Sequence, residues 1–330
     1  MTLLAVDNLT VTLNTVRGPA RAVRNLSFEL QKGQTLGIVG ESGCGKSVTA
    51  LAIMGLLPEN GWADGTVKLA GENLLTHSED QMCQVRGNRI GMVFQEPMTS
   101  LNPLHTVGRQ IAEAMRLHRG VSKAEARTEV LRLLDMVGIP EPTKRINSYP
   151  HQLSGGQRQR VMIAMALSCG PELLIADEPT TALDVTIQKQ ILDLIRNLIE
   201  DLGMAMILIS HNLGVIYQNV QDVIVMYGGA RVESGPTHDV FANLSHPYSQ
   251  GLFEAVPQID DTKASRRRLR TIPGTVPELA DLPAGCTFQD RCDYVTDACR
   301  PTQPPVVQIA AGHIVACLHI DAARKQWAAR

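Results

Sequence analysis

The sequence of 330 residues lacks any apolar run that approaches the roughly 20 residues needed to cross a bilayer. Its opening residues, 1–7, also lack the basic stretch and apolar run that mark a secretory signal. We therefore expect a soluble chain in a reducing compartment, which reaches a membrane only through partner proteins.

A bias toward charge of one sign is also missing, since 31 Lys and Arg stand against 33 Asp and Glu, a formal net charge of -2. This balance gives no reason to expect nucleic acid or anionic lipid as a partner, and we predict no nucleic-acid partner. Gly and Pro are not enriched to the level of disordered chains, and the 44% of hydrophobic residues suffices for a substantial core. The length has room for one large α/β domain and a smaller appendage.

A disulfide framework is the third absence, because the seven cysteines are too scattered to form one. Three of them lie singly in the first part of the chain, and four gather within its last 45 residues. In a reducing compartment, free thiols or metal ligands are expected in place of disulfides.

The first part of the chain has the pattern of an α/β core. Strand-like segments occur at 3–13 and 22–30. A short apolar strand at 35–40 enters a glycine-rich loop, and helix-forming residues follow at 46–57.

Further along, the segment 106–137 has charged and apolar residues at helical spacing, interrupted at Gly120. Continuous apolar runs at 173–176 and 206–209 are typical of central strands in a parallel sheet that is covered on both faces. We expect a helical insertion between two parts of the α/β core.

The strongest motif is the glycine-rich loop, which fits the pattern G-x-x-x-x-G-K-[ST] in the required strand-loop-helix context. Its residues and the one that follows are predicted to bind nucleotide: Gly40, Glu41, Ser42, Gly43, Cys44, Gly45, Lys46, Ser47 and Val48. The glycines let main-chain N–H groups point at the phosphates, and the next helix adds its positive N-terminal end. Lys46 is expected to reach the β- and γ-phosphates of ATP, and Ser47 to ligate Mg²⁺. A chance glycine-rich turn is the alternative, which the matched context disfavours.

Two acidic residues, Asp177 and Glu178, directly follow the apolar run at 173–176, at the end of the predicted strand. Asp177 is placed to hold Mg²⁺, directly or through water, and Glu178 to orient and polarise the attacking water. An isolated acidic pair is often only a solvated strand end, but the phosphate loop favours the catalytic interpretation.

A Ser-Gly-Gly turn lies 23 residues before Asp177 and opens a helix predicted at 157–166. Such a turn makes a second anion-binding helix N-terminus. It would compete for space with the phosphate loop of its own fold, so we predict a head-to-tail dimer in which it caps the γ-phosphate bound to another subunit. The residues of this turn are Ser154, Gly155, Gly156 and Gln157.

In combination, these motifs resemble those of the ABC ATPase family over about residues 3–255. The resemblance implies an α/β fold of the P-loop NTPase type, with a RecA-like core, an antiparallel β subdomain and a helical subdomain. We place the nucleotide-binding domain at 1–256 and its helical subdomain at about 97–155.

The resemblance also implies roles that the residues alone do not reveal. Gln95 would ligate Mg²⁺, sense the γ-phosphate and adjoin the contact with the membrane subunits, and His211 would contact the γ-phosphate. The loop that ends in Asp184 would communicate between the two nucleotide sites. The catalytic set is then Lys46, Gln95, Glu178 and His211.

One position departs from the family pattern. Such ATPases usually stack adenine on an aromatic side chain near the end of the first strand, and no Tyr, Phe or Trp precedes Phe28 here. We expect Phe28 to face the core, and adenine to rest on Leu13 or on the guanidinium plane of Arg21.

The last part of the chain carries four cysteines in the pattern C-x5-C-x6-C-x17-C: Cys286, Cys292, Cys299 and Cys317. Four unrelated thiols, a structural Zn²⁺ site helped by His313 or His319, and an iron–sulfur cluster are the alternatives. Zinc sites usually show closely spaced cysteine pairs, and clusters accept more varied spacings. Spacing alone leaves the metal open.

Segments at 245–249 and 273–277, and the cysteines themselves, resemble the C-terminal extension of dipeptide, oligopeptide and nickel importer ATPases. The segment 96–103 is also similar to that subgroup. Some members carry a [4Fe–4S] cluster on these four cysteines, so the resemblance favours the cluster over zinc. The Cys-rich extension is placed at 257–330.

We therefore predict an ATPase subunit that energises import of di- or oligopeptides or peptide-like solutes. The resemblance implies two transmembrane permease subunits, an extracytoplasmic solute-binding protein and a paralogous second ABC ATPase, with the chain on the cytoplasmic face of a bacterial inner membrane. Import of a nickel complex, a soluble ABC ATPase outside transport, and a redox sensor with ATPase output are the alternatives.

Overall fold

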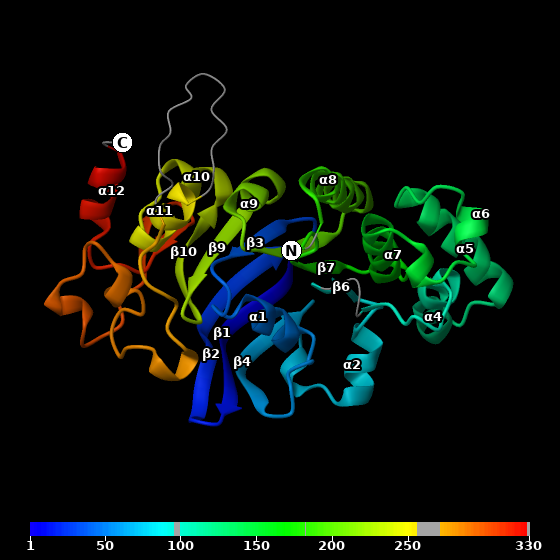
Figure 1. Ribbon diagram of the computed structural model, residues 1–330. Coiled ribbons are helices and arrows are strands. Elements are labelled where there is room, and N and C mark those ends of the chain that lie inside the picture. Colours follow the sequence, from blue (N-terminus) through cyan, green and yellow to red (C-terminus); the bar gives the residue numbers. More distant parts are fainter. Residues whose placement is uncertain (96–99, 182, 256–270, 329–330) are drawn as a thin grey trace, which may run out of the picture. The chain divides into compact units, whose positions relative to one another are not determined.

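The computed structural model describes residues 1–95, 100–181, 183–255 and 271–328 (Figure 1). The chain divides into two compact units, which are described separately here. The first unit comprises Met1–Leu4, Leu30–Gln34 and Lys68–Ile209. The second comprises Ala5–Glu29, Thr35–Val67 and Ser210–Arg330.

Three parallel strands form the sheet of the first unit, in the order β8-β7-β6. Every residue of β7 and β8 is buried, as we expected for the apolar runs at 173–176 and 206–209. The strands are β6 (Ile90–Val93), β7 (Leu173–Asp177) and β8 (Ala205–Ser210).

Six of the described α-helices belong to the first unit, and α4, α5 and α6 are grouped together there (Figure 1). Gly120 separates α4 from α5 with a left-handed φ of 61°, so the break predicted at this residue is confirmed. The helices are α2 (Glu79–Val85), α4 (Val107–Arg119), α5 (Lys123–Met136), α6 (Pro142–Arg145), α7 (Gly155–Leu167) and α8 (Val185–Leu202), with short 3₁₀ turns η1 (Leu74–Thr76) and η2 (Pro150–Gln152).

The second unit contains a sheet whose strands come from both ends of the chain, in the order β11-β12-β10-β9-β3. β3 and β9 are parallel, and the other neighbouring strands are antiparallel. The C-terminal strands thus extend the sheet that carries the phosphate loop. The strands are β3 (Thr35–Val39), β9 (Asp222–Tyr227), β10 (Ala230–Pro236), β11 (Val307–Ala310) and β12 (His313–Val315).

A separate four-stranded sheet has the order β2-β1-β4-β5, and most residues of its three long strands belong to the second unit. The short β5 pairs antiparallel with the end of β4. The strands are β1 (Thr2–Thr15), β2 (Gly18–Gln31), β4 (Gly61–Leu69) and β5 (Glu72–Asn73).

The helices of the second unit are short. The helix predicted at 46–57 ends at Ile53, because Gly55 turns the chain with a left-handed φ of 61°. The helices are α1 (Lys46–Ile53), α9 (Leu213–Asn219), α10 (Thr237–Ala242), α11 (Pro247–Glu254) and α12 (Ile320–Ala328), with 3₁₀ turns η3 (Leu279–Asp281), η4 (Gln289–Arg291) and η5 (Asp297–Cys299).

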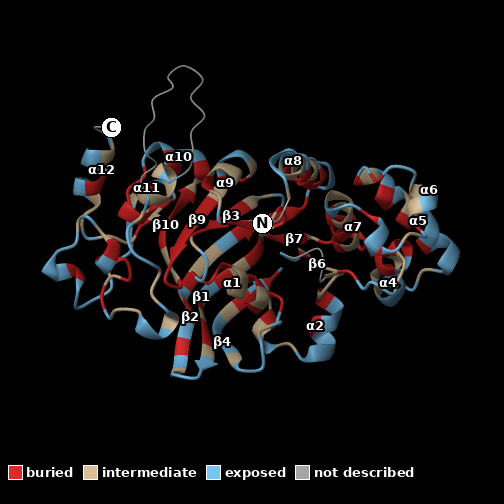
Figure 2. Ribbon diagram, in the orientation of Figure 1, coloured by how far each residue is buried: buried red, intermediate tan, exposed pale blue. Residues whose placement is uncertain are grey.

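The strands β3, β7, β8 and β9 are almost entirely buried, whereas helices such as α5 and α12 carry exposed faces (Figure 2). Within the described ranges, no helix has both the length and the apolar composition that a membrane crossing needs. Several predictions fall on residues 96–99, 182 and 256–270, among them the start of the helical subdomain and the domain boundary, and lie outside the described residues.

Candidate nucleotide-binding site

The phosphate loop of the second unit leads from the end of β3 into α1. Gly45 precedes the helix with φ of 98°, and a Cβ atom on it would lie 2.4 Å from the carbonyl oxygen of Ala22. Only glycine fits this position. Gly45 is the N-cap residue and has no side chain that could cap the helix, so the N-terminal end of α1 keeps the form that suits an anion.

Lys46 is buried, and its ammonium is held by the loop itself. Nζ donates hydrogen bonds to the carbonyl oxygens of Gly40 at 2.9 Å and Glu41 at 3.0 Å. Cys44 is fully buried beside it, and burial raises the pKa of the Cys44 thiol. The loop therefore holds one cation among main-chain dipoles, as phosphate binding requires.

Glu41 makes two contacts that the sequence did not indicate. Its main-chain N–H donates to the hydroxyl of Tyr248 at 2.8 Å, and its carboxylate forms an ion pair with Arg291 at 2.7 Å. Both partners lie more than 200 positions along the chain, at separations of 207 and 250. No local pattern of residues could have revealed them.

In the first unit, the structure brings two predicted residues into contact. The carboxylate of Glu178 accepts hydrogen bonds from Gln95 Nε2 at 3.1 Å and from Thr181 Oγ1 at 3.0 Å. Asp177, the buried last residue of β7, precedes it. Glu178 has a left-handed φ of 46°, a conformation that non-glycine residues adopt mainly where the surroundings enforce it. Thr181 is a further contact that the sequence analysis missed.

The Ser-Gly-Gly turn forms the N-terminus of α7, which starts at Gly155, two residues earlier than predicted. Ser154 is the N-cap residue, and its hydroxyl accepts from the main chain of Gln157 while the Gln157 side chain accepts from the N–H of Ser154. A Cβ atom on Gly156 would lie 2.9 Å from Cγ2 of Ile187 in α8. The turn thus packs against the first residues of α8.

Asp184 caps that neighbouring helix. Its Oδ1 atom accepts a hydrogen bond from the main-chain N–H of Ile187 at 3.0 Å. Because Ile187 also lies against Gly156, the loop before α8 and the turn before α7 share a contact. This is the element that the family resemblance assigned to communication between sites.

The predicted site residues are divided between the two units. The phosphate loop and His211 belong to the second unit, where His211 is exposed just after β8. Gln95, the two acids at the end of β7, the Ser-Gly-Gly turn and Asp184 belong to the first.

The residues predicted to hold adenine lie in the second unit. Leu13 is half-buried, and Gly61 lies so close to it that a Cβ atom there would be 2.7 Å from Leu13 Cδ2. Arg21 is exposed. Phe28 is half-buried in β2, on the strand face that it shares with the fully buried Leu26 and Leu30.

The four clustered cysteines line one cavity in the second unit, together with His246, Phe288 and His319. The thiols of Cys292 and Cys317 accept hydrogen bonds from main-chain N–H groups at 3.4 and 3.3 Å. Burial, with a contribution from the other thiols, raises the pKa of Cys292 to about 12 and that of Cys317 to about 11. In the part of the chain that the structure describes, no three His, Cys, Asp or Glu side chains are close enough to hold a single metal ion.

The chain matches two family models. Residues 23–181 match the ABC transporter family, and residues 232–299 match the C-terminal region of oligopeptide/dipeptide transporters.

Individual relatives match nearly the whole chain. A probable peptide ABC transporter ATP-binding protein of Sinorhizobium fredii is 53% identical over 90% of this chain and 89% of its own. The oligopeptide transport ATP-binding protein OppD of Salmonella typhimurium is 50% identical over 96% of this chain and 93% of its own.

Solved structures agree with the fold. A dimeric ATP-binding cassette, MJ0796, bound to ADP and Pi after hydrolysis, has a TM-score of 0.64 at 29% identity, over 71% of this chain and 98% of that one. The cassette cbiO1 of Clostridium perfringens, part of an ABC transporter complex, has a TM-score of 0.63 at 27% identity, over 74% of this chain and 92% of that one. The chain therefore belongs to the ATP-binding proteins of the ABC transporter family and is an ABC-type ATPase.

Proposed function

We propose that this ATPase energises the import of peptides or peptide-like solutes across a bacterial inner membrane. The observation that carries the proposal is the match of residues 232–299 to the C-terminal region of oligopeptide/dipeptide transporters. The ATP-binding cassette alone would be compatible with many substrates. Relatives named for peptide import share about half of their residues with the chain over almost its full length.

In this assembly the chain acts from the cytoplasmic face, bound to two permease subunits. A paralogous ATPase completes the pair, and an extracytoplasmic protein delivers the solute. The cassette occupies residues 1–256 with its helical subdomain at about 97–155, and the extension occupies 257–330. Copurification of the chain with the permeases tests the assembly, and the solute captured by the binding protein identifies the substrate.

Hydrolysis needs little covalent chemistry from the protein and depends on position and charge. Lys46 would neutralise the β- and γ-phosphates, while Ser47, Asp177 and Gln95 would hold Mg²⁺, which supplies further positive charge. Glu178 would orient the attacking water. The contacts of Glu178 with Gln95 and Thr181 support this role, because they fix the direction of a carboxylate whose main chain is already constrained.

His211 would contact the γ-phosphate from the end of β8. The Ser154 turn of this chain would cap the γ-phosphate bound to the second ATPase, and the partner's turn would do the same here. The capped but otherwise open N-terminus of α7 supports this role, as does the dimeric state of the similar cassette MJ0796.

The variant Glu178→Gln tests the catalytic assignment. It is expected to bind MgATP normally in the assembled transporter, yet to turn over at least roughly 10²-fold more slowly, since a key transition-state contact is lost. The matched control is Glu172→Gln, directly before the same strand, where the carboxylate pairs with Arg89 among the described residues. Near-normal turnover of Glu178→Gln would remove this residue from its role.

We also propose that the four cysteines hold a [4Fe–4S] cluster. All four line one cavity, and main-chain N–H groups donate to two of the sulfurs, an arrangement that suits thiolate ligands of a cluster. The spacing favours the cluster over zinc, because the closely spaced cysteine pairs that are usual in structural zinc sites do not occur among these four cysteines. The cluster would stabilise the extension proposed at 257–330, called the four-cysteine lobe below, by joining four separate positions of the chain.

Anaerobic purification followed by iron and acid-labile sulfide analysis tests the cluster. Iron and sulfide are expected in equal amounts in the wild type and are expected to be lost in Cys299→Ser. Cys83→Ser is the control and should keep both, because Cys83 is exposed and does not belong to the four clustered cysteines. Stoichiometric zinc in a colourless anaerobic preparation would overturn the assignment.

A further inference from the structure

Glu41, the second residue of the phosphate loop, makes three contacts, two with residues outside the loop and one with Lys46 within it. Its N–H donates to Tyr248 at 2.8 Å, its carboxylate pairs with Arg291, and its carbonyl accepts from Lys46 Nζ at 3.0 Å. Any displacement of Glu41 would therefore move the carbonyl that holds the phosphate-binding lysine.

The pairing with Arg291 is bidentate. Nη1 and Nη2 of Arg291 donate to the two carboxylate oxygens of Glu41 at 2.7 and 3.0 Å. The side chain of Arg291 is only 5% exposed and that of Glu41 28% exposed, so water screens this pair less than a surface pair. Such a planar fork fixes orientation as well as charge.

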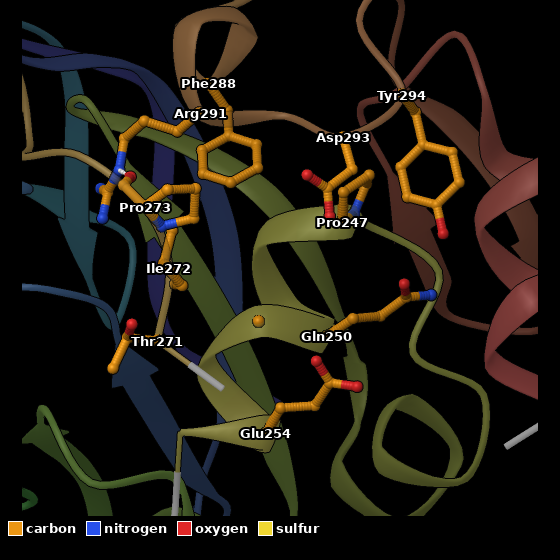
Figure 3. A pocket seen from close by; sticks show the side chains of 11 residues that line it. Pro247, Gln250, Glu254, Thr271, Ile272, Pro273, Phe288, Arg291, Asp293 and Tyr294 are labelled. Atoms are coloured by element: carbon orange, nitrogen blue, oxygen red, sulfur yellow. Dashed lines mark hydrogen bonds between the residues drawn. The ribbon is translucent and has the colours of Figure 1, made fainter. Parts of the chain in front are cut away.

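Arg291 is itself held firmly on its other sides. Its Nε donates to the carbonyl of Pro273 at 2.7 Å, and its guanidinium lies 5.7 Å from the ring centre of Tyr227 and 6.0 Å from that of Phe288. Figure 3 shows Arg291 beside Pro273 and Phe288 at one side of a cavity of about 260 Å³. Burial alone would lower the pKa of Arg291, but the hydrogen bonds to Glu41 and Tyr227 raise it above its ordinary value. The residue is a fixed cation.

This cation belongs to the four-cysteine lobe. Arg291 ends η4 and directly precedes Cys292, which lines the cysteine cavity. A residue of the lobe thus neutralises the acidic side chain of the phosphate loop. Without Arg291, Glu41 would place an unpaired, partly buried carboxylate on a loop that has to accept a triphosphate.

We propose that Arg291 is a positioning residue of the nucleotide site: it neutralises and orients Glu41, and through the Glu41 carbonyl and Lys46 it sets the affinity of the phosphate loop for MgATP. The proposal rests on the proposed function only in that the loop binds ATP. It requires no metal in the lobe.

Calorimetric titration of the full-length chain with MgATP tests this proposal. Arg291→Met is expected to weaken binding about tenfold, because the loop then carries an uncompensated negative charge. Arg291→Lys keeps the charge but loses the fork, so its affinity is expected to lie between those of Arg291→Met and the wild type. Arg300→Gln is the matched control, since within the described residues this exposed arginine of the lobe pairs with Asp297, three residues away.

The double variant separates positioning from a general effect on folding. Glu41→Gln alone removes the acidic group but also the charged partner of Arg291, so its affinity for MgATP is expected to lie between those of Arg291→Met and the wild type. Glu41→Gln combined with Arg291→Met leaves neither charge unpaired and is expected to bind MgATP more tightly than Arg291→Met alone.

Wild-type affinity in Arg291→Met, or no recovery in the double variant, would overturn the role of Arg291. Absence of MgATP binding by the wild type would instead contradict the proposed function.

Discussion

At the scale of single residues, Glu233 of β10 shows how the C-terminal segments of the second unit are held together. Its carboxylate is fully buried and accepts hydrogen bonds from the main-chain N–H groups of Ser245 at 2.8 Å and His246 at 3.1 Å. A third bond joins it to Nε2 of His313 in β12 at 2.9 Å. One side chain therefore connects two strands with the segment that opens α11.

Removal of this carboxylate is expected to destabilise the protein. Glu233→Ala leaves two buried N–H groups and one imidazole without their acceptor, so the free energy of unfolding should fall by about 2–4 kcal/mol. Glu129→Ala, which breaks an exposed ion pair with Arg132 on α5, should change it by less than about 0.5 kcal/mol. Denaturant unfolding of the full chain measures both changes. If the two variants lower the free energy of unfolding equally, the buried bonds of Glu233 contribute no more to stability than an exposed ion pair.

Residues proposed to carry chemistry can be located from the sequence where a short motif encodes them. Lys46, Ser154 and Glu178 lie in compact patterns whose local geometry follows from the adjoining strand or helix. Tyr248 and Arg291 were not predictable, because their contacts with the phosphate loop join positions more than 200 apart. Long-range ion pairs leave no periodic trace in a sequence.

At the scale of elements, three helices of the first unit, α2, α5 and α7, begin with a capping box within the described residues. Ser154 and Gln157 form a capping box on α7, and Ser122 and Glu125 form one on α5. The two caps should contribute equally to stability. Only the α7 terminus has glycine at its first two positions, which leaves its main-chain N–H groups accessible to an anion.

Alanine at the two caps separates stability from function. Ser154→Ala and Ser122→Ala should each lower the free energy of unfolding by about 1 kcal/mol, because each loses one N-cap bond. Only Ser154→Ala should also lower the ATPase turnover of the assembled transporter, by roughly 10²-fold or more if the turn contacts the γ-phosphate. Thermal unfolding and ATPase assays on both variants measure the two effects. Equal turnover in the two variants would exclude the Ser154 turn from the nucleotide site.

Elements with a strong local signal were predicted well. The buried runs of β7 and β8 and the break at Gly120 are visible in the sequence. The early end of α1 was missed because the neighbours of Gly55 are helix-forming residues, and the left-handed φ of this one glycine ends the helix. The pairing of β12 with β10 was missed because the short strand at 313–315 finds its partner about 80 positions earlier.

At the scale of the whole molecule, the predicted catalytic residues are divided between two units. The phosphate loop lies in one unit, and Glu178 and the Ser154 turn lie in the other. The family assignment and the dimeric relative MJ0796 support an account in which a second cassette completes the site. In that account hydrolysis depends on association of the two cassettes, so the ATPase rate stays low until the transporter assembles.

The ATPase rate as a function of assembly tests this central claim most directly. Turnover per chain is measured for the purified monomer and for the same chain assembled with the permeases and the second ATPase. The account predicts that the monomer is at least roughly 10²-fold slower, since it lacks the group that caps the γ-phosphate. A strict monomer that hydrolyses ATP as fast as the assembled transporter would contradict it.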